Sequence, residues 1–132
     1  MDKLRHIAIT VSDPEATARF YESTFGMQRV EKHALGVMLT DGVMSLAVLK
    51  FPTDAMAGDE RGKDFVGLHH MGFWVDDIDT SAARIESNGG KYHMELPGDS
   101  PSDKEFKYRD PNGIVFDIVN DDYATGAWGA GR

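Results

Sequence analysis

The sequence predicts an α+β fold built from two βαβββ modules. The chain contains two similar segments, 4–11 and 68–75, and each is a strand-like apolar run with a histidine at its third position. These histidines, His6 and His70, lie 64 positions apart, and in both copies an acidic residue and a helical stretch follow the strand. Self-similarity at a constant offset indicates a duplicated supersecondary unit. The repeat therefore places His6 and His70 at equivalent positions of two related halves.

The first module is predicted to contain one strand, one helix and three further strands. Segment 4–11 is rich in Ile and Val, which is typical of strands. Asp13 is a favourable N-cap and Pro14 suits the first helical position, so the apolar face over 14–24 indicates a helix. Gly26 is typical of the residue that follows a helix. We expect the other strands at 27–33, 35–40 and 43–50, with an Asp-Gly turn that favours a hairpin between the last two.

The second module repeats this order. After the strand at 68–75 we expect a helix from Asp79 to Ser87, which the following Asn-Gly-Gly sequence ends. The loop 96–103 is rich in turn-forming residues, and we expect it to be mobile. The remaining strands are predicted at 91–95, 104–109 and 114–119, and an Asp-Pro-Asn-Gly turn connects the last two.

The chain is long enough for one domain with its own core. We expect a single domain over residues 1–132, in which a polar, glycine-bearing linker separates the modules. The glycine-rich tail is expected to be pinned to the body by Trp128. The predicted boundaries are 1–50 for module one, 51–66 for the linker, 67–119 for module two and 120–132 for the tail.

Composition excludes several classes of function. The net charge of −8 argues against a nucleic-acid surface, which would be basic. No apolar run approaches the ~20 residues that cross a membrane, and the N-terminus lacks the apolar block of a signal peptide. We therefore expect a cytoplasmic protein without a membrane partner. Because the chain has no cysteine, a metal would have to bind histidine and carboxylate ligands.

Four sequence motifs, taken together with their order and spacing, resemble those of a known family. They cover the strand His6 to Val11, the helix end Phe20 to Met27, the strand His70 to Asp77, and the hairpin Asp110 to Ile118. Together they resemble the vicinal oxygen chelate superfamily, the glyoxalase, bleomycin-resistance and extradiol dioxygenase group, over residues 4–119. The resemblance implies a curved mixed sheet around a pocket for a small-molecule substrate. It also implies a homodimer.

The resemblance further implies a metal site. In metal-dependent members the ligands lie on the first and last strands of each half, which carries over to His6, His70 and Asp117, the last where members usually have Glu. The fourth position falls on Leu46 or, with a one-residue shift, on Ala47, and neither side chain binds a metal. Two imidazoles and one carboxylate leave coordination positions open, as in non-haem iron enzymes. The expected cofactor is a divalent metal ion, with Fe(II) the first choice and Mn, Ni, Zn or Co as alternatives.

Two further residues are candidates for catalysis. Ring-cleaving members have a tyrosine where this chain has Lys107, and strand alternation would point Lys107 and Asp117 into the same pocket. Such a lysine would stabilise an oxyanion, act as a base with a lowered pKa, or form an ordinary solvated ion pair. His93 is a candidate acid or base. His69 is expected on the opposite side of its strand from His70, as a packing or supporting residue.

Three functions are compatible with the sequence. The missing fourth ligand favours a metal-dependent enzyme of the extradiol ring-cleavage dioxygenase type, with a lactoylglutathione lyase-like isomerase or lyase as the alternative. A metal-free, bleomycin-resistance-type protein would instead sequester cationic drugs, which the negative charge would attract. In the third case Asp117 is the remnant of a lost site.

Overall fold

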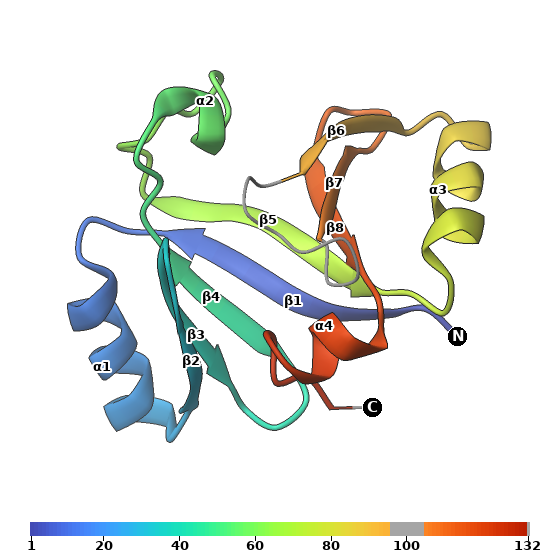
Figure 1. The fold of residues 1–132 in the computed structure, drawn as a ribbon. Coiled ribbons are helices and arrows are strands. Elements are labelled where there is room, and N and C mark those ends of the chain that lie inside the picture. Colours follow the sequence, from blue (N-terminus) through green and yellow to red (C-terminus); the bar gives the residue numbers. More distant parts are fainter. Residues whose placement is uncertain (96–104, 132) are drawn as a thin grey trace.

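The computed structural model describes residues 1–95 and 105–131 and confirms the predicted α+β class. Its strands form one eight-stranded mixed sheet (Figure 1). The strands of module one are β1 (Lys3–Thr10), β2 (Gln28–His33), β3 (Gly36–Thr40) and β4 (Ser45–Leu49). Those of module two are β5 (Gly67–Trp74), β6 (Lys91–Glu95), β7 (Phe106–Arg109) and β8 (Val115–Val119). The helices are α1 (Pro14–Phe25), α2 (Asp54–Ala57), α3 (Ile78–Ser87) and α4 (Asp121–Thr125).

The two long helices begin through equivalent side-chain caps. Asp13 accepts a hydrogen bond from the backbone N–H of Ala16 at 3.1 Å, and Asp77 accepts one from Thr80 at 2.8 Å. Each cap satisfies a backbone donor that the first helical turn leaves without a partner. Helix α1 ends at Gly26, whose φ of 70° is the left-handed conformation that glycine adopts readily. Helices α1 and α3 lie at opposite ends of the molecule (Figure 1).

The modules join through their first strands at the centre of the sheet. The strand order is β2-β3-β4-β1-β5-β8-β7-β6, and β1 runs antiparallel to β5. Each of these central strands is also parallel to the last strand of its own module, β4 or β8. This arrangement relates the halves by a pseudo-two-fold axis between β1 and β5. It brings the first and last strands of both modules, where the ligand candidates lie, to the middle of the molecule.

Each central strand has a β-bulge one residue before its histidine. The pairing of β1 with β5 passes over Arg5 in one strand and His69 in the other. The two bulges are again 64 positions apart, so the duplication extends to this irregularity. A bulge bends the strand and redirects a side chain. As a result His69 and His70 are both buried with their Nδ1 atoms 2.7 Å apart, and the prediction that they lie on opposite sides of β5 is wrong.

The linker and the tail both contain short helices. Segment 51–66 includes α2, which Thr53 caps through the backbone N–H of Met56. The tail includes α4, and beyond it Trp128 is fully buried, as the sequence predicted. Trp128 belongs to an apolar cluster with Phe51 and Met38 on the inner side of the sheet. The predicted mobile loop at 96–103 lies outside the described residues.

None of the helices in the described part of the chain is long and apolar enough to cross a membrane.

Candidate metal centre

Three adjacent strands bring the predicted ligand residues together. His6 lies on β1, His70 on β5 and Asp117 on β8, and all three side chains are buried. Each offers one ligand atom, and these atoms lie within 4.8 Å of one another. Such a group of two imidazole nitrogens and one carboxylate oxygen could hold a metal ion.

The Asp117 carboxylate faces two different surroundings. Its Oδ1 accepts a hydrogen bond from Lys107 Nζ at 2.7 Å. Its Oδ2 lies 2.9 Å from His70 Nε2 and 3.8 Å from His6 Nε2. Despite this proximity, Oδ2 has no hydrogen-bond partner with acceptable geometry among the described residues. A fully buried carboxylate oxygen without a donor is costly, and a cation between Oδ2 and the two nitrogens would satisfy it. The residues present therefore fit a metal ion.

In both imidazoles the Nδ1 nitrogen has a polar partner, as is usual for the second ring nitrogen of a metal-binding histidine. His6 Nδ1 lies 2.9 Å from Ser45 Oγ, and its ring stacks on Trp128 with a centroid distance of 4.3 Å. His70 Nδ1 lies 2.7 Å from His69 Nδ1. Burial lowers the pKa of His6 to about 4 and also places that of His70 well below its ordinary value. At neutral pH both rings are uncharged, which is the form that binds metals.

The sheet register resolves which residue occupies the fourth family position. Asp117 pairs with Gly72 in β5, and the equivalent residue of β1, Ala8, pairs with Ala47 in β4. Ala47 is therefore the counterpart of Asp117, and Leu46 is not. The same replacement of a charged residue by an apolar one occurs in the next strand outward. Lys107 of β7 pairs with Asp117, whereas Met38 of β3 pairs with Ala47. One half of the centre is charged and the other half is apolar.

Lys107 and Glu105 complete the charged half. Lys107 is only 3% exposed, so it is not the solvated lysine that the sequence also allowed. Its Nζ donates to Asp117 and, at 3.2 Å, to Glu105 Oε1. Burial alone would lower the pKa of Lys107, but the negative charges of Asp117 and Glu105 outweigh it and raise that pKa well above its ordinary value. The side chain is an ammonium ion, which favours the oxyanion-stabilising role over the base.

Sequence reasoning missed Glu105. The signal was its position two residues before Lys107, which puts both side chains on one face of an extended segment. Glu105 and Lys107 line a small cavity of about 20 Å³ together with His6 and His70. That volume suffices for a water molecule. The apolar part of its lining is formed by Leu35, Met38, Ala47, Leu49 and Phe51.

The structure does not bring His93 into this cavity. It lies half-buried on β6, where burial lowers its pKa and the charges of Arg109 and Glu60 act on it. These two residues form an ion pair with a distance of 2.9 Å. A catalytic role for His93 remains a sequence-based prediction, and its place in the described structure adds no support to it.

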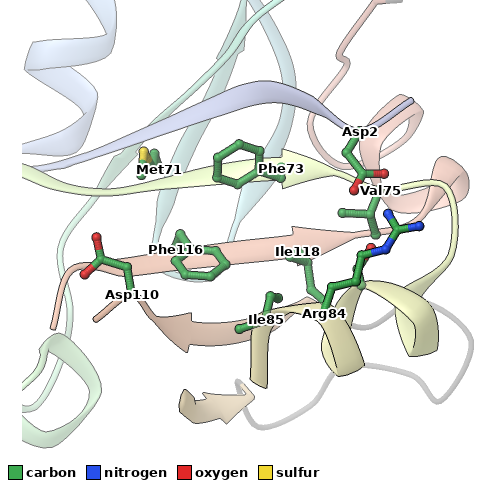
Figure 2. Close-up of a pocket in the computed structure, with 10 residues that line it drawn as sticks. Asp2, Met71, Phe73, Val75, Arg84, Ile85, Asp110, Phe116 and Ile118 are labelled. Atoms are coloured by element: carbon green, nitrogen blue, oxygen red, sulfur yellow. The ribbon is translucent and has the colours of Figure 1, made fainter. Parts of the chain in front are cut away.

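A larger cavity, of about 330 Å³, lies on the other side of the sheet (Figure 2). Phe73, Phe116 and Ile118 line it from β5 and β8, and Arg84 and Ile85 line it from α3. Because side chains alternate along a strand, this lining faces away from His70 and Asp117. Its described lining includes neither histidine nor a cluster of carboxylates, so we assign the chemistry to the smaller cavity.

Comparisons with known proteins find relatives of this chain. Residues 3–118 match the family described as Glyoxalase/Bleomycin resistance protein/Dioxygenase superfamily. The uncharacterized protein YaeR of Escherichia coli (strain K12) is 28% identical over 128 residues, which cover 89% of this chain and 95% of that protein.

Solved structures show the same fold. A variant of Streptomyces coelicolor methylmalonyl-CoA epimerase in complex with 2-nitronate-propionyl-CoA has a TM-score of 0.72 and 25% identity, covering 89% of this chain and 96% of that one. The hypothetical protein BH1468 from Bacillus halodurans C-125 has a TM-score of 0.70 and 18% identity, covering 90% of this chain and 94% of that one.

Proposed function

The chain belongs to the Glyoxalase/Bleomycin resistance protein/Dioxygenase superfamily, and on that premise we propose that it is a metal-dependent enzyme acting on a small oxygen-bearing substrate. His6, His70 and Asp117 would hold a divalent ion. The observation that carries this proposal is the buried Asp117 Oδ2, which lacks a hydrogen-bond partner among the described residues and faces two neutral imidazoles.

The reaction class best supported is proton transfer next to a carbonyl, as in an isomerase or epimerase. When bound, the metal supplies Lewis-acid stabilisation of a substrate oxygen. Glu105 is the carboxylate that lines the cavity beside Lys107, and we assign it as the base that takes the proton from carbon. The electron pair of the broken C–H bond moves onto the carbonyl oxygen. The buried Lys107 ammonium stabilises the negative charge that develops.

The similarity to the Streptomyces coelicolor epimerase supports this class, since that protein covers nearly the whole chain at 25% identity. The cavity is water-sized in this structure, so a substrate would have to widen it, and the apolar lining at Met38 and Ala47 would then give that substrate an orientation. Its oxygens would face the charged half, and a short apolar substituent would face these two side chains. The identity of the substrate remains to be determined by experiment.

A second candidate is ring cleavage of an aromatic diol. It is favoured by the three-residue ligand set, because Ala47 leaves the fourth protein position without a ligand. Lys107, however, stands where the ring-cleaving members of the family have a tyrosine. The two candidates predict different substrates and different metals, and one set of assays separates them.

Metal loading is the first test. Untagged protein is dialysed separately against Fe(II), Mn, Ni, Zn and Co, and its metal content is then measured. We expect about one ion per chain in the parent and a loss of binding in His6→Ala and Asp117→Asn. A saturating metal should also raise Tm, because an ion that binds only the folded state stabilises it. A metal content below ~0.2 ion per chain in the parent, with the same content in both variants, would contradict the metal proposal.

Activity is then assayed with the metal that binds. The panel contains methylmalonyl-CoA, hemithioacetals of 2-oxoaldehydes, and catechols. Exchange of the substrate proton for deuterium, lost in Glu105→Gln, supports proton transfer. Oxygen consumption with catechols supports the dioxygenase instead. Tight, chelator-insensitive binding of a cationic drug, without metal uptake, would identify a sequestering protein.

We also propose that the chain forms a homodimer. Several apolar side chains are exposed around β1 and β5, among them Leu4, Ile7 and Leu68, with exposed fractions of 43, 38 and 68%. Contiguous exposed apolar surface often marks an interaction site. Light scattering should give the mass of two chains, and Ile7→Glu should give one. A monomeric parent at ~100 µM would contradict the dimer.

A further inference from the structure

The segment between the modules returns to the β-bulge of β5. From the end of α2, the carbonyl oxygen of Ala57 lies 2.5 Å from His69 Nε2. From the turn that follows, Arg61 donates to the carbonyls of Leu68 and His69 at 2.9 and 2.7 Å. The side chain and the backbone of the bulged residue are therefore both held by the segment that the sequence presented as a linker.

These contacts determine where the protons of two neighbouring rings lie. A carbonyl oxygen only accepts, so His69 Nε2 must carry the proton that it donates to Ala57. Both rings are buried, which favours their neutral, singly protonated forms, and their Nδ1 atoms lie 2.7 Å apart, so one of the two must donate to the other. His69 Nδ1 is then an acceptor, and His70 Nδ1, at 2.7 Å, must be the donor.

The remaining nitrogen of His70 is left with a free lone pair. This is Nε2, the atom that lies 2.9 Å from Asp117 Oδ2. The geometry agrees, because the ring does not direct an Nε2–H bond at that oxygen and Oδ2 has no donor among the described residues. An unprotonated ring nitrogen within 4.8 Å of the other two ligand atoms is what a metal ligand requires.

We infer that His69 is a positioning residue that fixes the tautomer and orientation of His70, so that His70 Nε2 is always ready to bind a metal ion. The inference rests on the proposed function, and it adds a residue that does not itself contact the metal. The relay runs from the Ala57 carbonyl through His69 to His70.

The duplicated half explains why such a relay is needed. His6 has Ser45 as its Nδ1 partner, a residue on the parallel strand β4 directly beside it. Because Ala47 corresponds to Asp117, Ser45 corresponds to Val115, which offers no hydroxyl. His70 therefore lacks the partner that His6 has. The bulge at His69 supplies an imidazole in its place.

Nitrogen NMR of the metal-free parent protein tests the tautomer directly. Two-bond proton–nitrogen correlation spectra of ¹⁵N-labelled protein distinguish protonated from unprotonated ring nitrogens. We expect a proton on Nδ1 of His70 and on Nε2 of His69, with the other nitrogen of each ring unprotonated. A proton on His70 Nε2, or a doubly protonated His69 at pH 7.5, would overturn the inference. This measurement needs no variant and no metal.

Two substitutions test the consequence for metal binding. His69→Phe keeps a ring but removes both hydrogen bonds, and we expect Co²⁺ to bind roughly 10- to 100-fold more weakly. His69→Gln offers one amide acceptor and one amide donor, so it should recover most of the affinity. Equal affinity of the parent and His69→Phe would contradict the positioning role. So would an equal loss in both variants when their Tm values match that of the parent.

The outcomes separate this inference from the proposed function. If the spectra show the expected tautomers but no metal binds, the relay stands and the metal site fails. If the metal binds and His70 carries its proton on Nε2, the metal site stands and the relay fails.

Discussion

At the scale of single residues, Asp117 divides its carboxylate between a permanent cation and a place for a second one. Lys107 holds Oδ1, whereas Oδ2 faces the imidazoles. The ammonium prevents the carboxylate from turning and keeps one oxygen aimed at the centre of the triad. The positive charge of Lys107 also partly balances the negative charges of Asp117 and Glu105 when no metal is bound.

Removal of this ammonium should destabilise the fold. Lys107→Met leaves two carboxylates in a buried site without their counter-ion, and we expect a loss of about 3–5 kcal/mol in the free energy of unfolding. Urea denaturation measures it. Lys63→Met is the matched control, because the Lys63–Asp64 ion pair is exposed to solvent. This substitution should change the free energy of unfolding little. A loss in Lys107→Met as small as that in Lys63→Met would show that the buried network contributes little to stability.

The depressed pKa of His6 predicts how stability depends on pH. The ring titrates at about 4 in the folded state and at 6.5 in the unfolded chain, so the unfolded chain takes up more protons between these values. Stability is therefore fully present above pH 6.5 and falls as the pH drops to about 4, by roughly 3 kcal/mol from this residue. Urea unfolding of metal-free protein over pH 4–7.5 should show this slope.

His6→Phe keeps a buried ring without a titrating group and should flatten that slope. An unchanged slope would mean that other groups govern the acid limb.

The repeat and the family motifs predicted which side chains lie together. His6 and His70 were predicted as neighbours from the repeat and Asp117 from the family resemblance, and the structure brings ligand atoms of all three within 4.8 Å of one another. His69 was placed wrongly because a bulge depends on the partner strand, which one strand's own sequence does not reveal. Glu105 was missed because it lies at the border of a turn-rich segment, before the first paired residue of β7.

At the scale of elements, the two halves keep one plan and differ in what they place on it. The strands and the long helices were predictable because apolar periodicity and, for α1, the cap Asp13 mark them. Helices α2 and α4 have four and five residues. Segments this short show no helical period, and tertiary contacts decide their structure.

The register predicts how the missing ligand can be restored. Ala47→Glu places a carboxylate at the counterpart of Asp117, and we expect metal affinity to rise by about tenfold, or ~1.4 kcal/mol. Without metal, the same variant should lose stability, because a buried carboxylate has no partner there. Titration calorimetry and thermal unfolding measure the two effects.

Leu46→Glu is the control, since its side chain points to the other face of β4. Tighter metal binding in Leu46→Glu than in Ala47→Glu would refute the register-based equivalence.

At the scale of the whole molecule, the tail closes the centre from the side of β1. Trp128 is fully buried against His6, and a side chain at Gly72 would come within 2.7 Å of the indole. Trp128→Ala should therefore cost about 3–5 kcal/mol in the free energy of unfolding, with Trp128→Phe costing much less. Urea denaturation of both variants checks this. A loss below about 1 kcal/mol in Trp128→Ala would mean that the tail is not part of the core.

The central β1–β5 seam has one more consequence. His6 belongs to one half of the chain, whereas His70 and Asp117 belong to the other. An ion held by all three is a staple across the seam, and thermodynamic linkage makes the effect reciprocal. Every increment of free energy with which the ion binds is an increment by which the halves resist separation. A chain cut between the modules would therefore reassemble most firmly when metal is present, and the two fragments together would act as a metal-controlled split protein.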